Sequence, residues 1–534
     1  MMPLARRSMF LAALLTFGAS APATCADESA TPRQPNILYV MSDDHAAHAI
    51  GAYGGRLAGL NPTPNLDRLA AEGVRFTNAF CGNSICVPAR ATVMTGQHAH
   101  RHGVRTLNGG LPPKRQTLAR MMKEAGYETA MVGKWHLKEE PAAFDFYTVL
   151  PGQGQYHNPT FRVRGPKPWP QNEFQFNRYD GIHSSEAITE LSLKWLKNRK
   201  AKGKPFFLMH HFKAPHDNFQ NAEQYDFLYE NAEIPEPASL RNREGFGPIG
   251  RPQYGTSVGP RNERRNMGHH MFVDPSLSAE DYTGESYRRY LTKYLRTVRG
   301  LDDNFAKLID HLRETGELEN TIIFYTSDQG FMLGEHDLID KRWMYEESLR
   351  IPLIVRLPES FRAQFPAAPA PGSTEDAFVG NVDYAPTLLD LAGVAAPTGP
   401  GEDGMDGTSF APLLRGEEQD RPEEAYYRYW MNMTHHDVPA HYGVRTPDYK
   451  LAFFYGLPLD ARGALPEKVE PYWELYDLNE DPEEQHNVIA DPNYASVARN
   501  LRDRLNALRA DVGDTDAKYP EVLQRAESSW PVVD

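Results

Sequence analysis

The sequence predicts an α/β protein that carries a smaller α+β domain at its C-terminal end. Up to residue 416, short apolar runs alternate with segments of helical periodicity, which is typical of a sheet with crossover helices. Beyond that point, short tyrosine-rich segments follow one another, which is typical of antiparallel strands. The chain of 534 residues is 40% hydrophobic and 24% charged, so it can bury a large core and is not a disordered chain.

Five apolar runs are predicted to be buried strands of the larger domain. They comprise residues 37–41, 129–132, 206–209, 322–325 and 352–355. Helical periodicity predicts four helices between them, at residues 64–72, 118–126, 185–197 and 287–314. Thr63 and Pro64 supply the cap and the first position of the first of these helices, and Gly73 ends it.

Residues 218–285 form a polar stretch that is rich in proline, glycine and arginine and lacks steady periodicity. This composition predicts an elaborated surface excursion, and such long loops often shape a binding site. In the C-terminal part, strands are predicted at residues 426–429, 442–446, 450–455 and 473–478, and a helix at residues 494–509 closes the chain. We therefore expect a larger domain over residues 27–416 and a smaller one over residues 417–534.

The first 26 residues resemble an export signal. Arg6 and Arg7 supply a positive region, and the apolar stretch 9–17 that follows is too short to span a bilayer. Small residues at 19–21 and 23–26 offer cleavage sites. No other segment is apolar for long enough to be transmembrane. The sequence therefore predicts an exported protein, periplasmic or secreted, with no transmembrane segment.

Charge and cysteine content exclude several functions. The net charge of −14 argues against a generally basic nucleic-acid-binding protein, so no nucleic-acid partner is expected. The three cysteines, Cys25, Cys81 and Cys86, are too few for a disulfide framework or a four-cysteine zinc site. Any polyanionic partner must then be bound by a local cluster of cations.

Acidic and amide side chains follow two of the predicted strands. Asp43 and Asp44 come after the first strand, and Asp328 and Gln329 follow the strand at 322–325. The carboxyl ends of strands are where open α/β sheets bind ligands, so these distant pairs could converge on one site. Oxygen ligands favour a hard cation, with calcium fitting best and magnesium next. The alternative is that each pair only caps a turn.

Two sequence blocks stand out between these pairs. The first holds Cys86, Pro88, Arg90 and the dipeptide Thr95-Gly96. The second runs from Gly126 to His136 in the pattern Gly-Tyr-x-Thr-x-x-x-Gly-Lys-x-x-His. Taken alone, a single cysteine is more often a small buried apolar residue, and a Gly-Lys pair is usually a turn. Together the blocks resemble the two signatures of the sulfatase family, and the likeness extends from about residue 35 to about residue 490.

The resemblance implies an alkaline phosphatase-like fold, in which helices sandwich a large mixed sheet, and a smaller domain that completes the substrate pocket. It also implies that a maturation enzyme converts Cys86 to formylglycine, whose hydrated aldehyde is the nucleophile. Calcium, with magnesium the less favoured ion, would be held by the metal ligands of the family pattern. These are Asp43, Asp44, Cys86, Asp328 and Gln329.

The remaining catalytic roles are also carried over from the resemblance. Arg90 would hold the aldehyde hydrate, and His136 would hydrogen-bond it and act as a base. Lys134 and Lys341 would clamp the sulfate oxygens, and His216 would protonate the leaving oxygen. The chain departs from the common pattern at Ala89, where serine is frequent, and at Gln329, whose amide oxygen still suits a hard cation.

The resemblance implies an exported sulfatase that hydrolyses a sulfate ester of a carbohydrate. The segments at 441–445 and 448–451 are similar to those of bacterial sulfatases assigned to N-acetylglucosamine 6-sulfate, which makes this sugar one candidate substrate. Substrate contacts are expected from His435, His436, His441 and Arg445. Two alternatives stay open: a phosphoester or phosphonate ester hydrolase of the same superfamily, and an inactive sulfated-glycan-binding protein in which Cys86 is unmodified.

Overall fold

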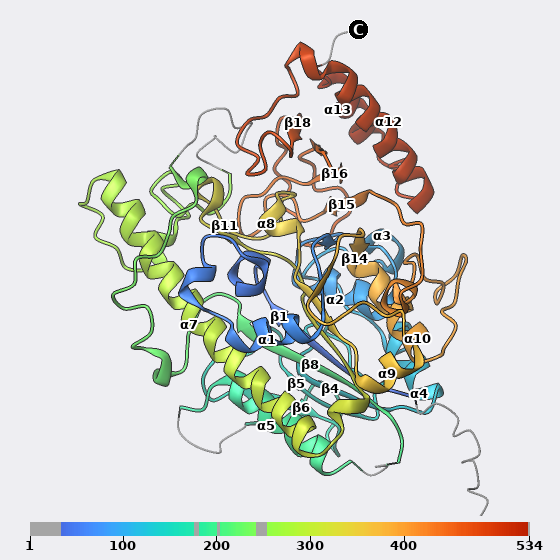
Figure 1. Ribbon diagram of the computed structural model, residues 1–534. Helices are drawn as coiled ribbons and strands as arrows, with labels where there is room; N and C mark the ends of the chain where they lie inside the picture. Colours follow the sequence, from blue (N-terminus) through green and yellow to red (C-terminus); the bar gives the residue numbers. More distant parts are fainter. Residues whose placement is uncertain (1–33, 176–180, 200–202, 242–253, 532–534) are drawn as a thin grey trace, which may run out of the picture. The chain divides into compact units, whose positions relative to one another are not determined.

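The computed structural model describes residues 34–175, 181–199, 203–241 and 254–531 (Figure 1). The predicted export signal, residues 1–26, lies outside these ranges. Residues from Gln34 onward belong to one compact unit, and the predicted boundary at residues 416/417 stays a prediction. In the part of the chain that is described, no helix is both long and apolar enough to cross a membrane.

A ten-stranded mixed sheet lies at the centre of the fold, as the family resemblance implied. Its strands lie in the order β13 (Ser373–Glu375), β2 (Val74–Phe76), β12 (Leu353–Arg356), β9 (Thr321–Ser327), β1 (Asn36–Asp43), β8 (Phe206–Pro215), β4 (Glu128–Lys134), β5 (Phe146–Leu150), β6 (Thr160–Val163) and β7 (Glu173–Gln175). The five central strands, from β9 to β5, run parallel to one another. Their carboxyl ends therefore meet at one edge of the sheet.

Helices cover both faces of this sheet (Figure 1). Every residue of β1 is buried, and its side chains alternate between two apolar clusters, with Tyr39 in one and Leu38 in the other. Strands buried on both faces are expected to be continuously apolar, which is why β1 was predictable. One cluster contains α2 (Cys86–Thr95), α4 (Thr117–Glu124) and α10 (Tyr384–Leu391). The other contains α1 (Pro64–Glu72), α5 (Ser184–Lys197) and α7 (Ala279–Glu314).

The predicted helix starts need two corrections. Helix α1 begins at Pro64 as expected, but the Thr63 side chain does not cap it, because its hydroxyl accepts a hydrogen bond from the Gly51 amide. The carboxylate of Asp302, from α7, caps α1 instead, because it accepts hydrogen bonds from the backbone amides of residues 65 and 66. Helix α7 starts at Ala279, eight residues before the predicted start at 287, because Ser278 caps it by accepting from the Asp281 amide.

Residues 218–285 are more than a surface excursion. Apolar side chains from this stretch, among them Phe219, Leu240 and Met267, are buried in one cluster with the N-terminal half of α7. Short elements bring these residues together without long-range periodicity, which is why the sequence pattern suggested only a loop. Residues 242–253 of the stretch lie outside the described ranges.

The C-terminal part contains the predicted antiparallel sheet, in the order β15 (Ala425–Tyr429), β16 (His441–Arg445), β17 (Tyr449–Phe454) and β18 (Tyr472–Asp477). Helix α12 (Ala495–Val512) packs on this sheet. The chain does not end with α12, because α13 (Pro520–Ser528) follows and buries Val522 and Ala526 in the same cluster.

Short elements connect these layers. The short helices are α3 (Ala99–His102), α6 (Met267–His270), α8 (Glu346–Leu349), α9 (Glu359–Gln364) and α11 (Ala411–Arg415). The short strands are β3 (Ala79–Phe80) with β14 (Val379–Gly380), and β10 (Met332–Leu333) with β11 (Ile339–Asp340).

Candidate active site

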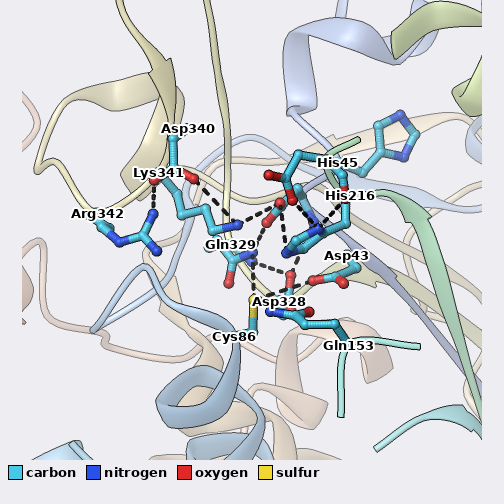
Figure 2. Close-up of polar contacts among 12 residues, drawn as sticks. Asp43, His45, Cys86, Gln153, His216, Asp328, Gln329, Asp340, Lys341 and Arg342 are labelled. Carbon is cyan, nitrogen blue, oxygen red and sulfur yellow. Dashed lines mark hydrogen bonds and ion pairs between the residues drawn. The ribbon is translucent and has the colours of Figure 1, made fainter. Parts of the chain in front are cut away.

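The parallel strands deliver polar side chains to one point (Figure 2). Asp43 is the last residue of β1, and Asp44 comes next. Asp328 and Gln329 follow β9. Lys134 is the last residue of β4, and His216 follows β8. Cys86 is the first residue of α2, and Lys341 follows β11. The sequence prediction that the two acidic pairs converge is therefore met by the fold, because β1 and β9 are neighbours in the sheet.

Three buried carboxylates form the centre of this site. One oxygen atom from each of Asp43, Asp44 and Asp328 lies within 4.8 Å of the others, and a second such group joins Asp43, the Cys86 sulfur and His216. The Cys86 thiol donates to Asp43 Oδ1 at 3.5 Å. Burial and then Asp43 raise the pKa of the Cys86 thiol well above its usual value, so this thiol stays protonated in the apo protein.

Gln329 completes the set of oxygen ligands. Its Nε2 donates to Asp44, whereas its Oε1 is buried and has no hydrogen-bond partner among the described residues. Burial and then Asp43 raise the pKa of Asp328 to about 8, although Arg90 acts in the opposite sense. Burial acts on Asp43 in the same sense, but Lys134, His216 and Arg90 together hold its pKa well below the usual range. An unpartnered amide oxygen beside three crowded carboxylates fits a hard divalent cation.

Three cationic side chains face these carboxylates. Arg90 donates to Asp328 Oδ2 through Nε at 3.0 Å, and its Nη2 lies 2.8 Å from the same oxygen. Lys134 donates to Asp43 and to Gln153 Oε1, the latter at 2.5 Å. Lys341 donates to Asp44 Oδ2 at 2.6 Å. Burial alone would lower the pKa of Lys341, but Asp44 raises it above the usual value, so this side chain stays charged.

Two of the predicted histidines border the same group. His216 Nε2 lies 3.8 Å from Asp44, and its Nδ1 lies 2.5 Å from Asp217 Oδ1. His136 follows β4, and its Nδ1 is buried without a hydrogen-bond partner among the described residues. Burial and then Lys134 lower the pKa of His136 well below its usual value. A neutral imidazole with a free nitrogen can accept a proton.

Glycine at position 133 is required by the packing of β4 on β8. The φ angle of Gly133 is +102°, and a Cβ atom there would lie 1.9 Å from the carbonyl oxygen of His211. Only glycine fits such a position. Strand β4 therefore stays paired with β8 up to Gly133, and the side chain of the next residue, Lys134, extends to the Asp43 carboxylate.

Side chains that the sequence did not single out also touch the site. Gln153 follows β5 and holds Lys134, and Tyr156 donates to the backbone carbonyl of His216. The Lys213 ammonium lies over the Tyr156 ring at 4.6 Å, and burial together with Lys134 lowers its pKa to about 8. Gln153 could have been found because it follows a parallel strand at the same sheet edge, whereas no motif marks it.

A cavity of about 600 Å³ adjoins the site. Asp217, the neighbour of His216, lines it together with His435 and His436. His436 Nε2 lies 3.4 Å from Asp340, which itself lies 3.5 Å from the Lys341 ammonium. Two of the four expected substrate contacts are thus beside the site.

The other two expected substrate contacts lie elsewhere. His441 is fully buried, with its ring 4.4 Å from that of Phe454 and 6.3 Å from that of Trp343. Arg445 pairs with Glu346 at 3.3 Å and lies over the Phe80 ring. Both residues are on β16, an interior strand whose side chains are covered on both faces. The expectation that they reach over the active site is therefore wrong.

Comparisons with known proteins agree with this arrangement. The family model "Sulfatase" matches residues 35–394, and that of the N-sulphoglucosamine sulphohydrolase C-terminal region matches residues 334–511. The N-acetylglucosamine-6-O-sulfatase of Bacteroides thetaiotaomicron is 35% identical over 559 residues, covering 96% of this chain and 92% of the relative. A solved structure described as a complex with its substrate D-glucosamine-2-N,6-O-disulfate is 34% identical with a TM-score of 0.76, covering 91% of this chain and 100% of that chain.

A more distant similarity concerns the fold alone. The phosphonate monoester hydrolase of Agrobacterium radiobacter is 22% identical with a TM-score of 0.65, covering 90% of this chain and 96% of that chain. The family match, by contrast, spans more than half of the chain and includes Cys86, Arg90 and the acidic pairs. Together with the 35% identical relative, it shows that this chain belongs to the sulfatase family and is a sulfuric ester hydrolase.

Proposed function

We propose that this sulfatase removes the 6-O-sulfate group from a glucosamine unit of a sulfated glycan, using formylglycine at position 86 and a bound calcium ion. The observation that carries the proposal is the position of the Cys86 sulfur. It shares one buried group with a carboxylate oxygen of Asp43 and a ring nitrogen of His216. Three cationic side chains, Arg90, Lys134 and Lys341, surround the same carboxylates.

The choice of sugar rests on the relatives. The Bacteroides enzyme is named for N-acetylglucosamine 6-O-sulfate, and the solved complex holds a glucosamine that is sulfated at positions 2 and 6. Both share about a third of their residues with this chain over nearly its whole length. A 6-O-sulfated glucosamine unit is the substrate feature that the two have in common.

The calcium ion would be held by Asp43, Asp44, Asp328 and Gln329, together with the modified residue 86. A divalent cation there favours the deprotonated form of a hydroxyl group, which the hydrate of a formylglycine aldehyde provides. Arg90 fits the role of orienting that hydrate, because its guanidinium is fixed by Asp328 and by the Lys134 carbonyl, the latter at 2.7 Å.

The remaining side chains serve the sulfate group and the protons. Lys134 and Lys341 pair with carboxylates in the free protein, and they would turn to the sulfate oxygens when calcium takes over those carboxylates. His216 would protonate the leaving sugar oxygen, with Asp217 orienting its ring through Nδ1. His136, neutral and with a free nitrogen, would take the proton from the residue 86 hydroxyl as sulfate is released.

A substrate panel tests the proposal. The protein is produced together with a formylglycine-generating maturation enzyme and assayed on glucosamine 6-O-sulfate, N-acetylglucosamine 6-O-sulfate, a galactose 4-O-sulfate, a phosphate monoester and a phosphonate monoester. We expect the two 6-O-sulfated sugars to have the highest kcat/KM. A preference for the phosphate or phosphonate ester would overturn the proposal and favour a phosphoester or phosphonate ester hydrolase of the same superfamily.

Mass spectrometry of the peptide that contains position 86 tests the other alternative, an inactive sulfated-glycan-binding protein in which Cys86 is unmodified. We expect the mass change that accompanies replacement of the CH₂SH side chain by an aldehyde, and loss of both that change and the activity in Cys86→Ala. A matched control is Cys81→Ala, because Cys81 is buried in the apolar core of the larger domain. Unmodified Cys86 in a protein that binds sulfated sugars without cleaving them would favour the binding-protein hypothesis.

Export completes the proposal. The positive and apolar regions of residues 1–26 support a cleaved signal and a periplasmic or secreted enzyme. N-terminal sequencing of the protein recovered from a bacterial host is expected to begin after residue 21 or residue 26. Recovery of the full-length chain from the cytoplasm alone would contradict it.

A further inference from the structure

Two segments that carry side chains of the active site are joined by one buried tyrosine. Cys86 lies two residues after Ser84, and Arg342 follows Lys341 directly. The Tyr427 hydroxyl group accepts a hydrogen bond from the Ser84 backbone amide at 3.4 Å and donates one to the Arg342 backbone carbonyl at 2.5 Å. One phenol oxygen from the C-terminal sheet therefore connects the segment of Cys86 to the segment of Lys341.

The side chains of the same two segments also meet in the active site. Lys341 donates to Asp44 Oδ2 at 2.6 Å. Gln329 Nε2 donates to Asp44 and lies 4.0 Å from the Cys86 sulfur (Figure 2). The two segments are thus linked twice, by side chains at the carboxylates and by Tyr427 at the backbone.

The backbone on both sides of Lys341 is held in a costly conformation. Asp340 and Arg342 have φ angles of +81° and +85°, in the left-handed region that residues with a side chain rarely adopt. Such a turn persists only where the surrounding structure fixes it. The Arg342 side chain donates to Asp340 within the turn, and the Tyr427 hydroxyl group holds the Arg342 carbonyl from outside it.

The position of the Tyr427 ring is itself fixed by packing. Tyr427 is fully buried on β15. Its ring stacks on that of His441 at a centroid distance of 5.5 Å, and the His441 ring stacks on that of Trp343 at 6.3 Å. Trp343 lies two residues after Lys341. His441 therefore belongs to a stack of three rings that holds the phenol oxygen against the Lys341 segment.

The other end of the link is fixed as well. Ser84 is fully buried, and its Oγ donates to the Ser348 carbonyl at 2.9 Å. Helix α2 begins at Cys86, two residues later. The first turn of α2 is therefore held relative to Tyr427 through a short stretch of backbone.

We propose that Tyr427 is a positioning residue of the sulfatase reaction, because its hydroxyl group sets where the Lys341 ammonium lies relative to residue 86. Without this hydroxyl group, the strained turn around Lys341 would relax and the ammonium would meet the sulfate group out of alignment. A misplacement of about 1 Å can lower a rate about 100-fold. The inference rests on the proposed function, in which Lys341 binds the sulfate oxygens.

Removal of the hydroxyl group alone tests the inference. Tyr427→Phe keeps the ring and its stacking, and we expect kcat/KM to fall at least about tenfold on the ester that wild type cleaves best. Tyr426→Phe is the matched control, because Tyr426 is the preceding residue of β15, is buried, and donates to Asp514 Oδ2 at 2.7 Å rather than to either segment. Both variants lose a buried hydrogen bond, so we expect a lower Tm in both but a lower kcat/KM only in Tyr427→Phe.

A double-mutant cycle shows whether Tyr427 acts through Lys341. Lys341→Met is expected to lower kcat/KM at least about 100-fold. In that background, adding Tyr427→Phe should lower kcat/KM by no more than about twofold, because the ammonium that the hydroxyl group positions is gone. A purely structural role would give the same fold decrease in both backgrounds. That result, or wild-type kcat/KM in Tyr427→Phe, would overturn the inference.

The cycle and the proposed function fail in different ways. Rates are expressed per chain that carries the aldehyde at position 86, measured by mass spectrometry, so that incomplete maturation of a variant does not imitate a loss of activity. If wild type cleaves an ester other than a 6-O-sulfated glucosamine best, the proposed substrate is wrong, and the cycle on that ester still tests Tyr427. Equal fold decreases in the two backgrounds, by contrast, refute the positioning role whatever the substrate.

Discussion

Replacing Arg90 with methionine is expected to destabilise the protein through uncompensated buried charge. The Arg90 side chain is 1% exposed and that of Asp328 is fully buried. The guanidinium contacts Asp328 at 3.0 and 2.8 Å and lies 3.6 Å from Asp43. Methionine has a similar length but no charge, so at a pH above the Asp328 pKa of about 8 the change leaves two buried carboxylates without this cation.

The magnitude follows from the cost of breaking a buried ion pair, which is about 3–5 kcal/mol. The entropy of unfolding is about 2.1 cal/mol/K per residue, so a chain of this length has about 1 kcal/mol/K. Arg90→Met should therefore lower Tm by about 3–5 °C. Arg288→Met is the matched control, because its side chain is 49% exposed and pairs with Glu285 at the surface; such exposed pairs contribute about 0–1 kcal/mol.

Thermal unfolding is measured after chelation of divalent cations and again with calcium added. In the chelated protein, the double variant Arg90→Met/Asp328→Asn should recover at least half of the loss in Tm, because it removes a carboxylate that lacks a partner. A cation present at 100 times its Kd stabilises a protein by about 2.7 kcal/mol, so added calcium should raise the Tm of this chain by about 3 °C. An Arg90→Met Tm within about 1 °C of wild type under chelation would refute the argument for charge compensation.

Two further variants test the sheet edge and a buried carboxyl group. Gly133→Ala places a Cβ atom 1.9 Å from the His211 carbonyl oxygen at a φ of +102°, so we expect a decrease in Tm of at least about 2 °C and reduced activity. Gly165→Ala, where the added atom meets nothing within 4 Å, should change neither. Burial raises the pKa of Glu474 from 4.5 to about 8, although Tyr345 and Tyr476 donate to it. The folded protein then binds one more proton than the unfolded chain between these values, so stability should fall as pH rises from 5 to 8, by up to about 1.4 kcal/mol per pH unit. Glu474→Gln should flatten this dependence in denaturant unfolding, whereas the exposed Glu521→Gln should leave it unchanged; equal slopes in wild type and Glu474→Gln would contradict the expectation.

Much of the fold and the centre of the site could be predicted from sequence, because both depend on strong local patterns. The apolar run at 37–41 had to be a strand buried on both faces, and parallel neighbours then bring Asp43 and Asp328 together. The positions of His441 and Arg445 could not be predicted in this way. Their alternation predicts a strand but does not say which element covers each face, and here that face packs on Trp343 and Phe80.

Other features escaped prediction because tertiary contacts decide them. Asp302 comes from α7, more than 200 residues after the helix that it caps, so no local signal could replace Thr63 in that role. Helix α13 buries only Val522 and Ala526, which is too few apolar positions for a clear helical period. Gln153 acquires its role only because β5 lies beside β4 and so brings it to Lys134.

The charges of the site connect cation binding to substrate binding. In the free protein, Lys134 pairs with Asp43 and Lys341 pairs with Asp44, so these carboxylates and ammonium groups neutralise one another. A divalent cation on the same carboxylates would compete with both lysines. Lys134 would then keep its hydrogen bond to Gln153, and Lys341 would keep the Asp340 carboxylate at 3.5 Å, so both buried ammonium groups would face less negative charge, which is costly. A sulfate ester supplies the missing negative charge at that point. Because such coupling is reciprocal, the cation should increase affinity for the anionic substrate by the same factor as the substrate increases affinity for the cation.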